Sequence, residues 1–367
     1  MDDTETAAIP SEHQGKTEDL DVRLARAILD RKRELLAEGI SADESARLAD
    51  EYGESWLKRA ASLGLPALRS DLSDRVSGLE ETNTEYLTTL SRHWASALDQ
   101  YRLAAECCRL VGIRLWNHAD EENLGLERLD LQSALAGTWA RSIRTGVEVD
   151  VLLRAGLPRG AAARARTMHE LAVTAFVISE YGVLDDHVGL GSRYVAYGAV
   201  KVWRDAKEYQ KHALQLGTKP LTDDEMARYR SEYDEAVSTY PRLDRPNGWA
   251  AQLPGYGRGS FEELERMAGL DHFRPYYSWF SHEVHSNVKG DRLNMVTSPD
   301  GRAYHTGPRL DGLADPAHAA LRALHQVVAA WGSILDLNAM DVVYLQAGRL
   351  LVDEAADALA AAERGLA

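Results

Sequence analysis

The sequence predicts an all-α protein, a multi-helix bundle with an N-terminal helical extension. Apolar residues recur at intervals of three and four from Leu20 to the end of the chain, which is the spacing of helices with one buried face. Alternating runs of β-branched and aromatic residues, which indicate strands, are almost absent. We therefore expect helices to make up at least about 60% of the chain, with no sheet of more than two short strands.

Capping residues, glycines and prolines predict where the helices begin and end. Ser41 with Glu44, and Thr222 with Glu225, have the spacing of capping boxes, in which two side chains satisfy backbone amides at a helix start. Gly64 and Pro66 predict the end of the helix that begins near Ser41. The expected helices are 20–38, 41–63, 72–113, 129–153, 159–181, 189–216, 222–237, a helix around Ser281, and 315–364 with a break near Asn338.

Composition changes along the chain predict its domains. Residues 1–18 are polar and acidic, so we expect a disordered leader. The acidic, glycine-containing segment 118–127 predicts a boundary between an N-terminal helical region, 19–125, and a helical core domain, 126–367. Prolines and glycines exclude regular structure from residues 240–260, where Trp249 and Tyr256 favour an ordered segment.

Charge and cysteine content limit the class of protein. The chain has 42 Lys and Arg against 57 Asp and Glu, a net charge of -15, which disfavours unspecific binding to nucleic acids and anionic membranes. Its start lacks the basic and apolar parts of a signal peptide, and no apolar run approaches a membrane span. Cys107 and Cys108 are neighbours, which disfavours a disulfide between them. We expect a cytoplasmic protein with no membrane partner.

The most informative segment is 274–289, which is rich in aromatic, hydroxyl and imidazole side chains. Tyr277, Ser281 and His285 follow at intervals of four, so in a helix they share one face, and Ser278 with His282 forms a similar pair. Buried polar groups of this kind need hydrogen-bond partners. The segment indicates either structurally satisfied histidines or an acid–base or anion-binding site. Its His-Glu-x-His pattern is not that of a zinc protease, and we expect no metal and no cofactor.

A second candidate site begins with Arg166. Glu170 lies four residues further on, beside a strongly apolar run, and His169 lies between the two. This pattern is compatible with a structural ion pair, or with a site where Arg166 binds an anion and Glu170 orients a histidine. The arginine-rich stretch 141–166 is compatible with solvated helix charge or with a phosphate site. The apolar stripe from Leu321 to Leu335 predicts core or a dimer seam.

Three sequence blocks carry a resemblance to a known family. They are Arg166-x-x-x-Glu170, Arg193-Tyr194, and Asn247-Gly-Trp249 followed by Tyr277-x-x-x-Ser281-x-x-x-His285. Over roughly residues 130–300 the chain resembles an uncharacterised family of bacterial helical proteins, the domain of unknown function family 5677. The resemblance implies a helical domain in which polar residues converge from three helices, and it implies no particular activity.

A looser similarity is to small helical-bundle ribonucleases of prokaryotic defence and toxin systems, which usually act as dimers. Their site is an arginine followed by a histidine on the same helix. In this chain Arg274 and His282 are further apart than in that motif, and Pro275 places Arg274 at the helix start. The departure leaves the source of the catalytic arginine open, with Arg166 and Arg193 as candidates.

Three functional hypotheses follow. The first is an RNA-cleaving enzyme in which His285 or His282 moves a proton and Arg166 or Arg193 stabilises phosphate charge. The alternative is a non-enzymatic ligand-binding or protein-binding module, and the third hypothesis is a structural partner in a larger assembly. The expected partners are a second copy of the chain and either RNA or a small anionic ligand. The expected binding residues are Glu170, Arg193, Tyr194, Trp249, Tyr277 and Ser281.

Overall fold

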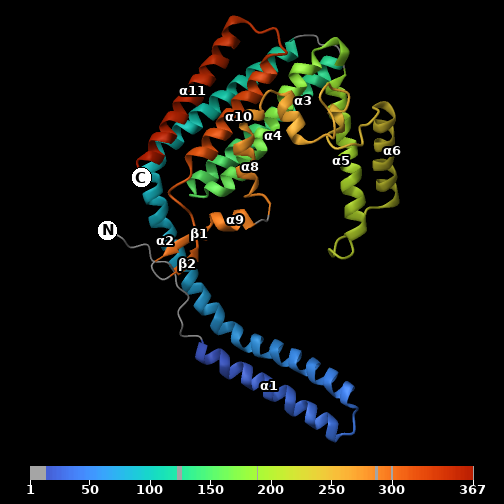
Figure 1. The fold of residues 1–367 in the computed structure, drawn as a ribbon, viewed down its shortest axis with the longest axis vertical. Coiled ribbons are helices and arrows are strands. Elements are labelled where there is room, and N and C mark those ends of the chain that lie inside the picture. Colours follow the sequence, from blue (N-terminus) through green and yellow to red (C-terminus); the bar gives the residue numbers. More distant parts are fainter. Residues whose placement is uncertain (1–13, 122–125, 188, 286–287, 299–300, 367) are drawn as a thin grey trace. The chain divides into compact units, whose positions relative to one another are not determined.

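The computed structural model describes residues 14–121, 126–187, 189–285, 288–298 and 301–366 (Figure 1). Helices make up 79% of the structure, which confirms the all-α prediction. The sheet within these residues is a single antiparallel hairpin of β1 (Met295–Ser298) and β2 (Gly301–Tyr304). None of the described helices combines the length and the apolar character needed to cross a membrane.

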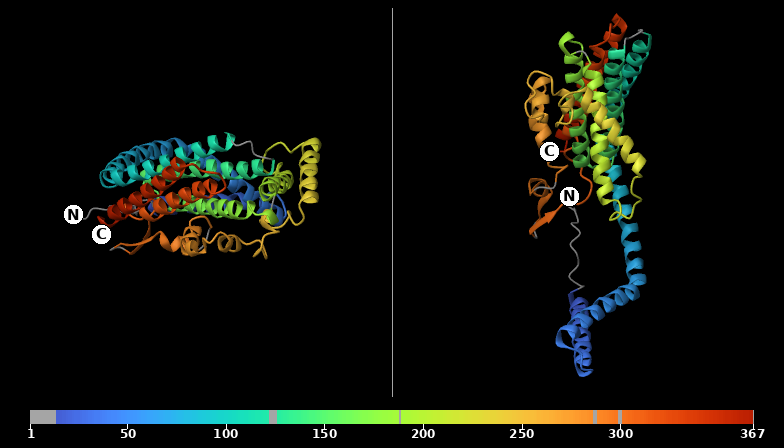
Figure 2. Two further views of the ribbon diagram at one scale, coloured as in Figure 1. Left: turned by 90° about the horizontal axis from the view of Figure 1, so that it is seen from above. Right: turned by 90° about the vertical axis from the view of Figure 1, so that its right-hand side faces the viewer.

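The chain divides into two compact units, residues 1–85 and 86–367. In the first unit α1 (Gln14–Ala37) lies beside the N-terminal part of α2 (Ala42–Glu121), as both views show (Figures 1 and 2). Leu35 and Ala49 are buried there. A Cβ atom added to Gly53 of α2 would lie 2.7 Å from Ile28 Cδ1 of α1, so this glycine permits close helix packing. The predicted leader lies mostly outside the described residues, and α1 already begins at Gln14.

Helix α2 continues through the point where the sequence predicted its end. It is 80 residues long and contains Pro66. A proline in a helix removes one amide donor, here the one that would bond to the carbonyl of Ser62. Residues 61–66 are exposed, so water can satisfy that carbonyl and the helix tolerates the loss. The two units therefore meet within α2, whereas the sequence predicted a division near residue 125.

The second unit is built around two helices, α4 (Pro158–Gly182) and α10 (Ala314–Gly332). The C-terminal part of α2, α3 (Leu126–Arg154) and α11 (Ala339–Arg364) complete this bundle (Figure 2). Met168 of α4 and Trp331 of α10 are fully buried in its core. The indole of Trp331 donates a hydrogen bond to Gln132 Oε1 of α3 at 2.8 Å. The apolar stripe predicted for α10 is therefore core along most of its length.

Shorter elements connect α4 to α10. In chain order they are η2 (Asp185–His187), α5 (Leu190–His212), α6 (Asp223–Thr239), η3 (Gly248–Ala250), α7 (Phe261–Met267), η4 (Asp271–Phe273), α8 (Arg274–Ser281) and α9 (Val288–Leu293). The capping box of Thr222 and Glu225 is confirmed at the start of α6. Ser260 and Glu263 form another at the start of α7, which the sequence analysis did not identify.

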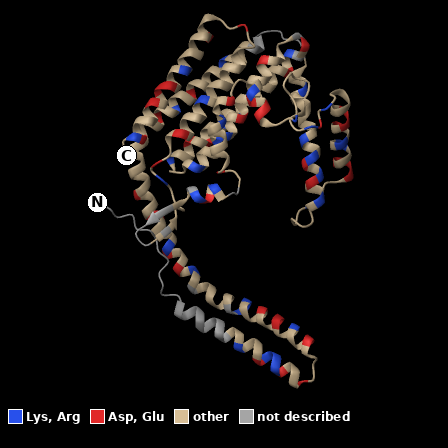
Figure 3. Cartoon of the chain, in the orientation of Figure 1, with Lys and Arg blue, Asp and Glu red and all other residues tan. Residues whose placement is uncertain are grey.

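Charged side chains of both signs are interspersed along the helices (Figure 3). In the predicted basic stretch, Arg154 Nε lies 2.9 Å from Asp150 Oδ1. Glu148 lies 3.4 Å from Arg164 and 4.0 Å from Arg144, measured between the closest oxygen and nitrogen. These acids offset much of the charge that was expected to hold a phosphate.

Arg193 of α5 holds the irregular segment 240–260 in place. Its guanidinium, 2% exposed, donates hydrogen bonds to the carbonyls of Pro241 at 2.6 Å and Gly248 at 2.9 Å. Trp249 is 3% exposed and packs edge-on against Tyr194, with ring centroids 5.2 Å apart. The segment is therefore irregular but ordered, as predicted. Arg193, Tyr194 and Trp249, which the sequence suggested as binding residues, contribute to this packing.

Arg193→Leu is expected to lower the free energy of unfolding by roughly 2 to 4 kcal/mol, because two buried carbonyls lose their donor. Urea denaturation followed by circular dichroism measures the change. Lys201→Leu, at an exposed position on the same helix, is the matched control and should change stability little. Equal stability of the two variants would contradict a supporting role for Arg193.

Candidate functional site

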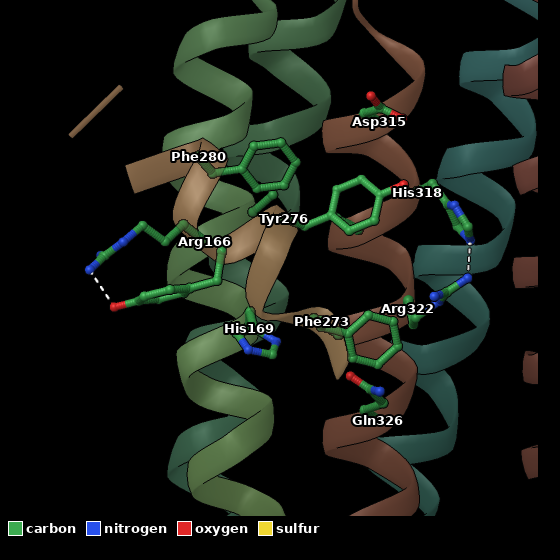
Figure 4. Close-up of a pocket in the computed structure, with 13 residues that line it drawn as sticks. Arg166, His169, Phe273, Tyr276, Phe280, Asp315, His318, Arg322 and Gln326 are labelled. Carbon is green, nitrogen blue, oxygen red and sulfur yellow. Dashed lines mark hydrogen bonds between the residues drawn. The ribbon is translucent and has the colours of Figure 1, made fainter. Parts of the chain in front are cut away.

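Arg166 of α4 joins this helix to α8. Its Nε donates a hydrogen bond to Ser281 Oγ at 2.8 Å, and its Nη2 donates to the Tyr277 hydroxyl at 2.6 Å. The same Nη2 lies 3.2 Å from Glu170 Oε1, one turn along α4. The side chain of Arg166 is only 14% exposed, and Figure 4 shows its guanidinium in a hydrogen bond on the side of α4 away from the rings of Phe273 and Tyr276. The structure thus brings together four of the residues that the sequence selected.

Hydrogen bonds close this Arg166 cluster, which consists of Arg166, Glu170, Tyr277 and Ser281. The Tyr277 hydroxyl donates to Glu170 Oε1 at 3.0 Å while it accepts from Arg166. Burial, followed by the negative charge of Glu170, raises the pKa of Tyr277 to about 12, so its hydroxyl keeps its proton at neutral pH. Ser281 Oγ donates to the Tyr277 carbonyl at 2.7 Å. The charge of Arg166 is therefore offset within the protein.

The two predicted catalytic histidines lie beyond the end of α8. The sequence predicted a helix of about four turns, but α8 is eight residues long and ends at Ser281. The backbone amide of His282 bonds to the carbonyl of Trp279, and that of His285 bonds to the carbonyl of Ser281 at 3.1 Å. His285 is exposed in the following turn. The expected three-residue face is therefore wrong: Tyr277 and Ser281 share it, and His285 does not continue it.

The backbone tightens after Ser281, where α8 ends. The hydroxyl of Ser281 bonds to the carbonyl of Tyr277 one turn back, as Ser and Thr hydroxyls also do inside the longer helices, so this bond does not account for the helix end. The amides of residues 282–284 then bond to carbonyls three residues back, the pattern of a tightening last turn.

His169, also on α4, is held by a buried carboxylate that the sequence analysis missed. Its Nε2 lies 2.9 Å from Oε1 of Glu265, which has no exposed side-chain area. A carboxylate only accepts, so Nε2 donates. Arg274 Nη1 bonds to the other oxygen of Glu265. Glu265 lies among several glutamates of α7, and nothing in the sequence distinguishes it from its exposed neighbours.

A pocket lies beside the Arg166 cluster, between α4, α8 and α10 (Figure 4). Its empty volume is about 590 Å³, counting the open mouth. Three aromatic rings form one wall: Phe273, Tyr276 and Phe280. A polar face of α10 forms the opposite wall, with Asp315, His318, Arg322 and Gln326. These four residues follow at helical spacing, a signal that the sequence analysis did not use.

Arg322 brings a positive charge to this pocket. Its Nη2 donates to His318 Nε2 at 2.8 Å, and its guanidinium carbon lies 4.9 Å from the centre of the Phe273 ring. Since guanidinium only donates, His318 accepts and is neutral. Burial, then the charge of Arg322, lowers the pKa of His318. Among the described residues no carboxylate pairs with Arg322.

The structure is that of an all-α protein with a pocket between three helices, lined by aromatic rings and by charged groups of both signs. Residues 132–302 match the model of a family of unknown function (DUF5677), which confirms the resemblance over that segment. The matched segment is less than half of the chain; it contains α4 and α8 but not α10. No curated protein and no solved structure matches the chain. In the parts of the chain that the structure describes, no three His, Cys, Asp or Glu side chains are placed to hold a metal ion.

A double-mutant cycle tests whether Arg166 and Tyr277 stabilise the fold together. We expect Arg166→Met to cost roughly 2 to 4 kcal/mol and Tyr277→Phe about 1 to 2 kcal/mol, because each change leaves a buried partner without its hydrogen bond. The double variant should cost less than the sum by at least about 0.5 kcal/mol. Denaturation gives the four values, and Tyr276→Phe is the control. Strict additivity would show that the two side chains act independently.

Two half-buried histidines, His318 and His325, predict loss of stability in mild acid. Burial is the first cause that lowers the pKa of His318 and of His325. The unfolded chain takes up protons as the pH falls through about 6.5, whereas the folded protein binds them only at lower pH. The urea midpoint should therefore fall between about pH 7.5 and pH 5.5. In a variant carrying His318→Gln and His325→Gln the urea midpoint should fall less steeply over this pH range. An unchanged dependence of the midpoint on pH would contradict the assigned cause.

Proposed function

We propose that the pocket between α4, α8 and α10 binds a small organic anion with an apolar body. The observation that carries this proposal is the guanidinium of Arg322, which faces the pocket without a carboxylate partner. A buried or half-buried cation without a counterion costs stability, and such groups often mark binding sites. A carboxylate of a ligand would supply the missing charge through charge-assisted hydrogen bonds.

The walls of the pocket support a ligand with an apolar part. Phe273, Tyr276 and Phe280 offer ring surfaces, and Ala319 and Ala323 of α10 leave space opposite them. The cavity volume is about 100 Å³, which is below the usual range for drug-sized ligands and suits a slender one. The net charge of -15 opposes a long polyanion, whereas one compact anionic group interacts mainly with its immediate surroundings because salt screens longer distances.

The RNA-cleaving hypothesis has less support from the geometry. The hydrogen bonds of Arg166 go to Ser281, Tyr277 and Glu170, and those of Arg193 go to backbone carbonyls. Arg166 is thus already engaged, and Arg193 is 2% exposed, so although its Nη1 has no hydrogen-bond partner it is closed off from a phosphate chain. His285 lies in the turn after α8. Ribonuclease activity stays a prediction, which incubation of the protein with mixed RNA, beside a His285→Ala variant, would test.

The binding proposal predicts a charge-dependent interaction with aromatic acids. Isothermal titration calorimetry should detect binding of phenylpropionate but not of the uncharged phenylpropanol. Arg322→Gln should weaken phenylpropionate binding about tenfold or more, because it removes an ion pair that is partly shielded from water. Arg228→Gln, at an exposed arginine on α6, is the matched control.

Two results would contradict the proposal. One is that phenylpropionate, indolepropionate and octanoate all fail to bind the wild-type protein at millimolar concentration. The other is that Arg322→Gln binds them as well as the Arg228→Gln control does. Melting temperatures of both variants, measured without ligand, ensure that weakened binding reflects the pocket and not partial unfolding.

A further inference from the structure

We infer that the ligand of this pocket is zwitterionic, with an anionic group on Arg322 and a cationic group on Asp315 at the other end. The inference rests on the proposed function and specifies the chemical class of its ligand. Asp315 and Arg322 lie on the same helix and line the same pocket. Figure 4 shows the ring of Tyr276 between them.

Asp315 is not needed to stabilise the start of its own helix. An acid near a helix N-terminus usually serves the free backbone amides there. In α10 that function belongs to Glu363 of α11, whose carboxylate accepts from the amides of Gly312 at 2.6 Å, Leu313 at 3.1 Å and Ala314 at 3.2 Å. Asp315 is therefore a second acid at a helix start that is already capped.

The surroundings of Asp315 favour binding of a cationic group. Its carboxylate has no hydrogen bond or ion pair with another residue in the described parts of the chain. Partial burial, and then the charge of Glu363, raises the pKa of Asp315, although its side chain stays exposed at the pocket. A cationic group of a ligand would offset both effects.

The neighbouring charges are already paired. Asp315 and Phe280 also line a second pocket, which adjoins the first. In that pocket Arg159 Nη1 lies 2.6 Å from Glu283 Oε1, and Arg309 Nη2 lies 2.8 Å from Asp311 Oδ2. Asp315 lies where the two pockets adjoin, and its negative charge has no ion-pair partner among the described residues.

The helix sets the distance between the two charged ends of the ligand. Asp315 and Arg322 are seven residues apart, so they lie on the same face of α10 with a rise of about 10 Å between their Cα atoms. Because Arg322 reaches back one turn to His318, its guanidinium lies nearer to Asp315 than this rise. A ligand that reaches both needs an apolar middle shorter than about 10 Å, lying against the rings of Phe273 and Tyr276. An ω-amino acid with a medium-length chain has this shape.

Calorimetric titration of the full chain with octanoate and aminooctanoate tests the inference. Wild-type protein is expected to bind aminooctanoate about tenfold more tightly than octanoate, because only the former places an ammonium group near Asp315. In Asp315→Asn this preference should vanish while octanoate still binds. Asp205→Asn, at an exposed acid on α5, should keep the preference. Comparison with aminohexanoate shows which chain length best spans the two groups.

The outcomes separate the two proposals. The wild type could bind octanoate and aminooctanoate equally, with Arg322→Gln weakening both. That result would overturn the inference of a zwitterionic ligand, and the proposed anion site would stand. A preference for aminooctanoate that survives Asp315→Asn would overturn the role of Asp315. Failure of both compounds to bind the wild type would overturn the anion site and the inference that rests on it.

Discussion

The hydrogen bonds of Arg166 to Tyr277 and Ser281 hold α8 against α4, and the pocket depends on them. Helix α8 has only eight residues and one buried side chain, Phe280, which is too little to fix a helix by apolar contact alone. The guanidinium supplies the missing attachment through two hydrogen bonds, with Glu170 close enough to offset its charge. With α8 held in this way, its aromatic side chains face α10 across a space that stays open.

The distribution of charge around that space explains why we assign a function to it. The positive charge of Arg166 and the negative charge of Glu265 have partners within the protein, so they contribute to structure. Arg322 and Asp315 form no ion pair in the described chain, although Asp353 lines a neighbouring pocket with Arg322. For the half-buried Arg322 this arrangement costs stability, and proteins retain such costs mainly at sites that bind something else. The two charges lie on one face of α10, so the proposed anion site and the inferred cation site both depend on this helix.

Local patterns predicted the helices and both residue pairs of the Arg166 cluster, but they did not predict contacts between residues distant in sequence. The four-residue spacings of Arg166 with Glu170 and of Tyr277 with Ser281 are visible in the sequence, because each pair lies on one helix. The bond between His169 and Glu265 joins residues 96 positions apart, and no local signal announces it. The end of α8 was mispredicted because the helical spacing of polar residues continues past Ser281, whereas the backbone turns there. The continuation of α2 through Pro66 depends on solvent exposure there, which periodicity does not reveal.

The central claim is that Arg166 holds α8 in place, and hydrogen exchange of backbone amides tests it most directly. Mass spectrometry would compare the wild type with Arg166→Met, peptide by peptide. Faster exchange in residues 274–281, with unchanged exchange in α10 and in the buried part of α4, is the predicted result, because only the attachment of α8 is lost. Unchanged protection of residues 274–281 in the variant would show that α8 is held by other contacts and would contradict the account.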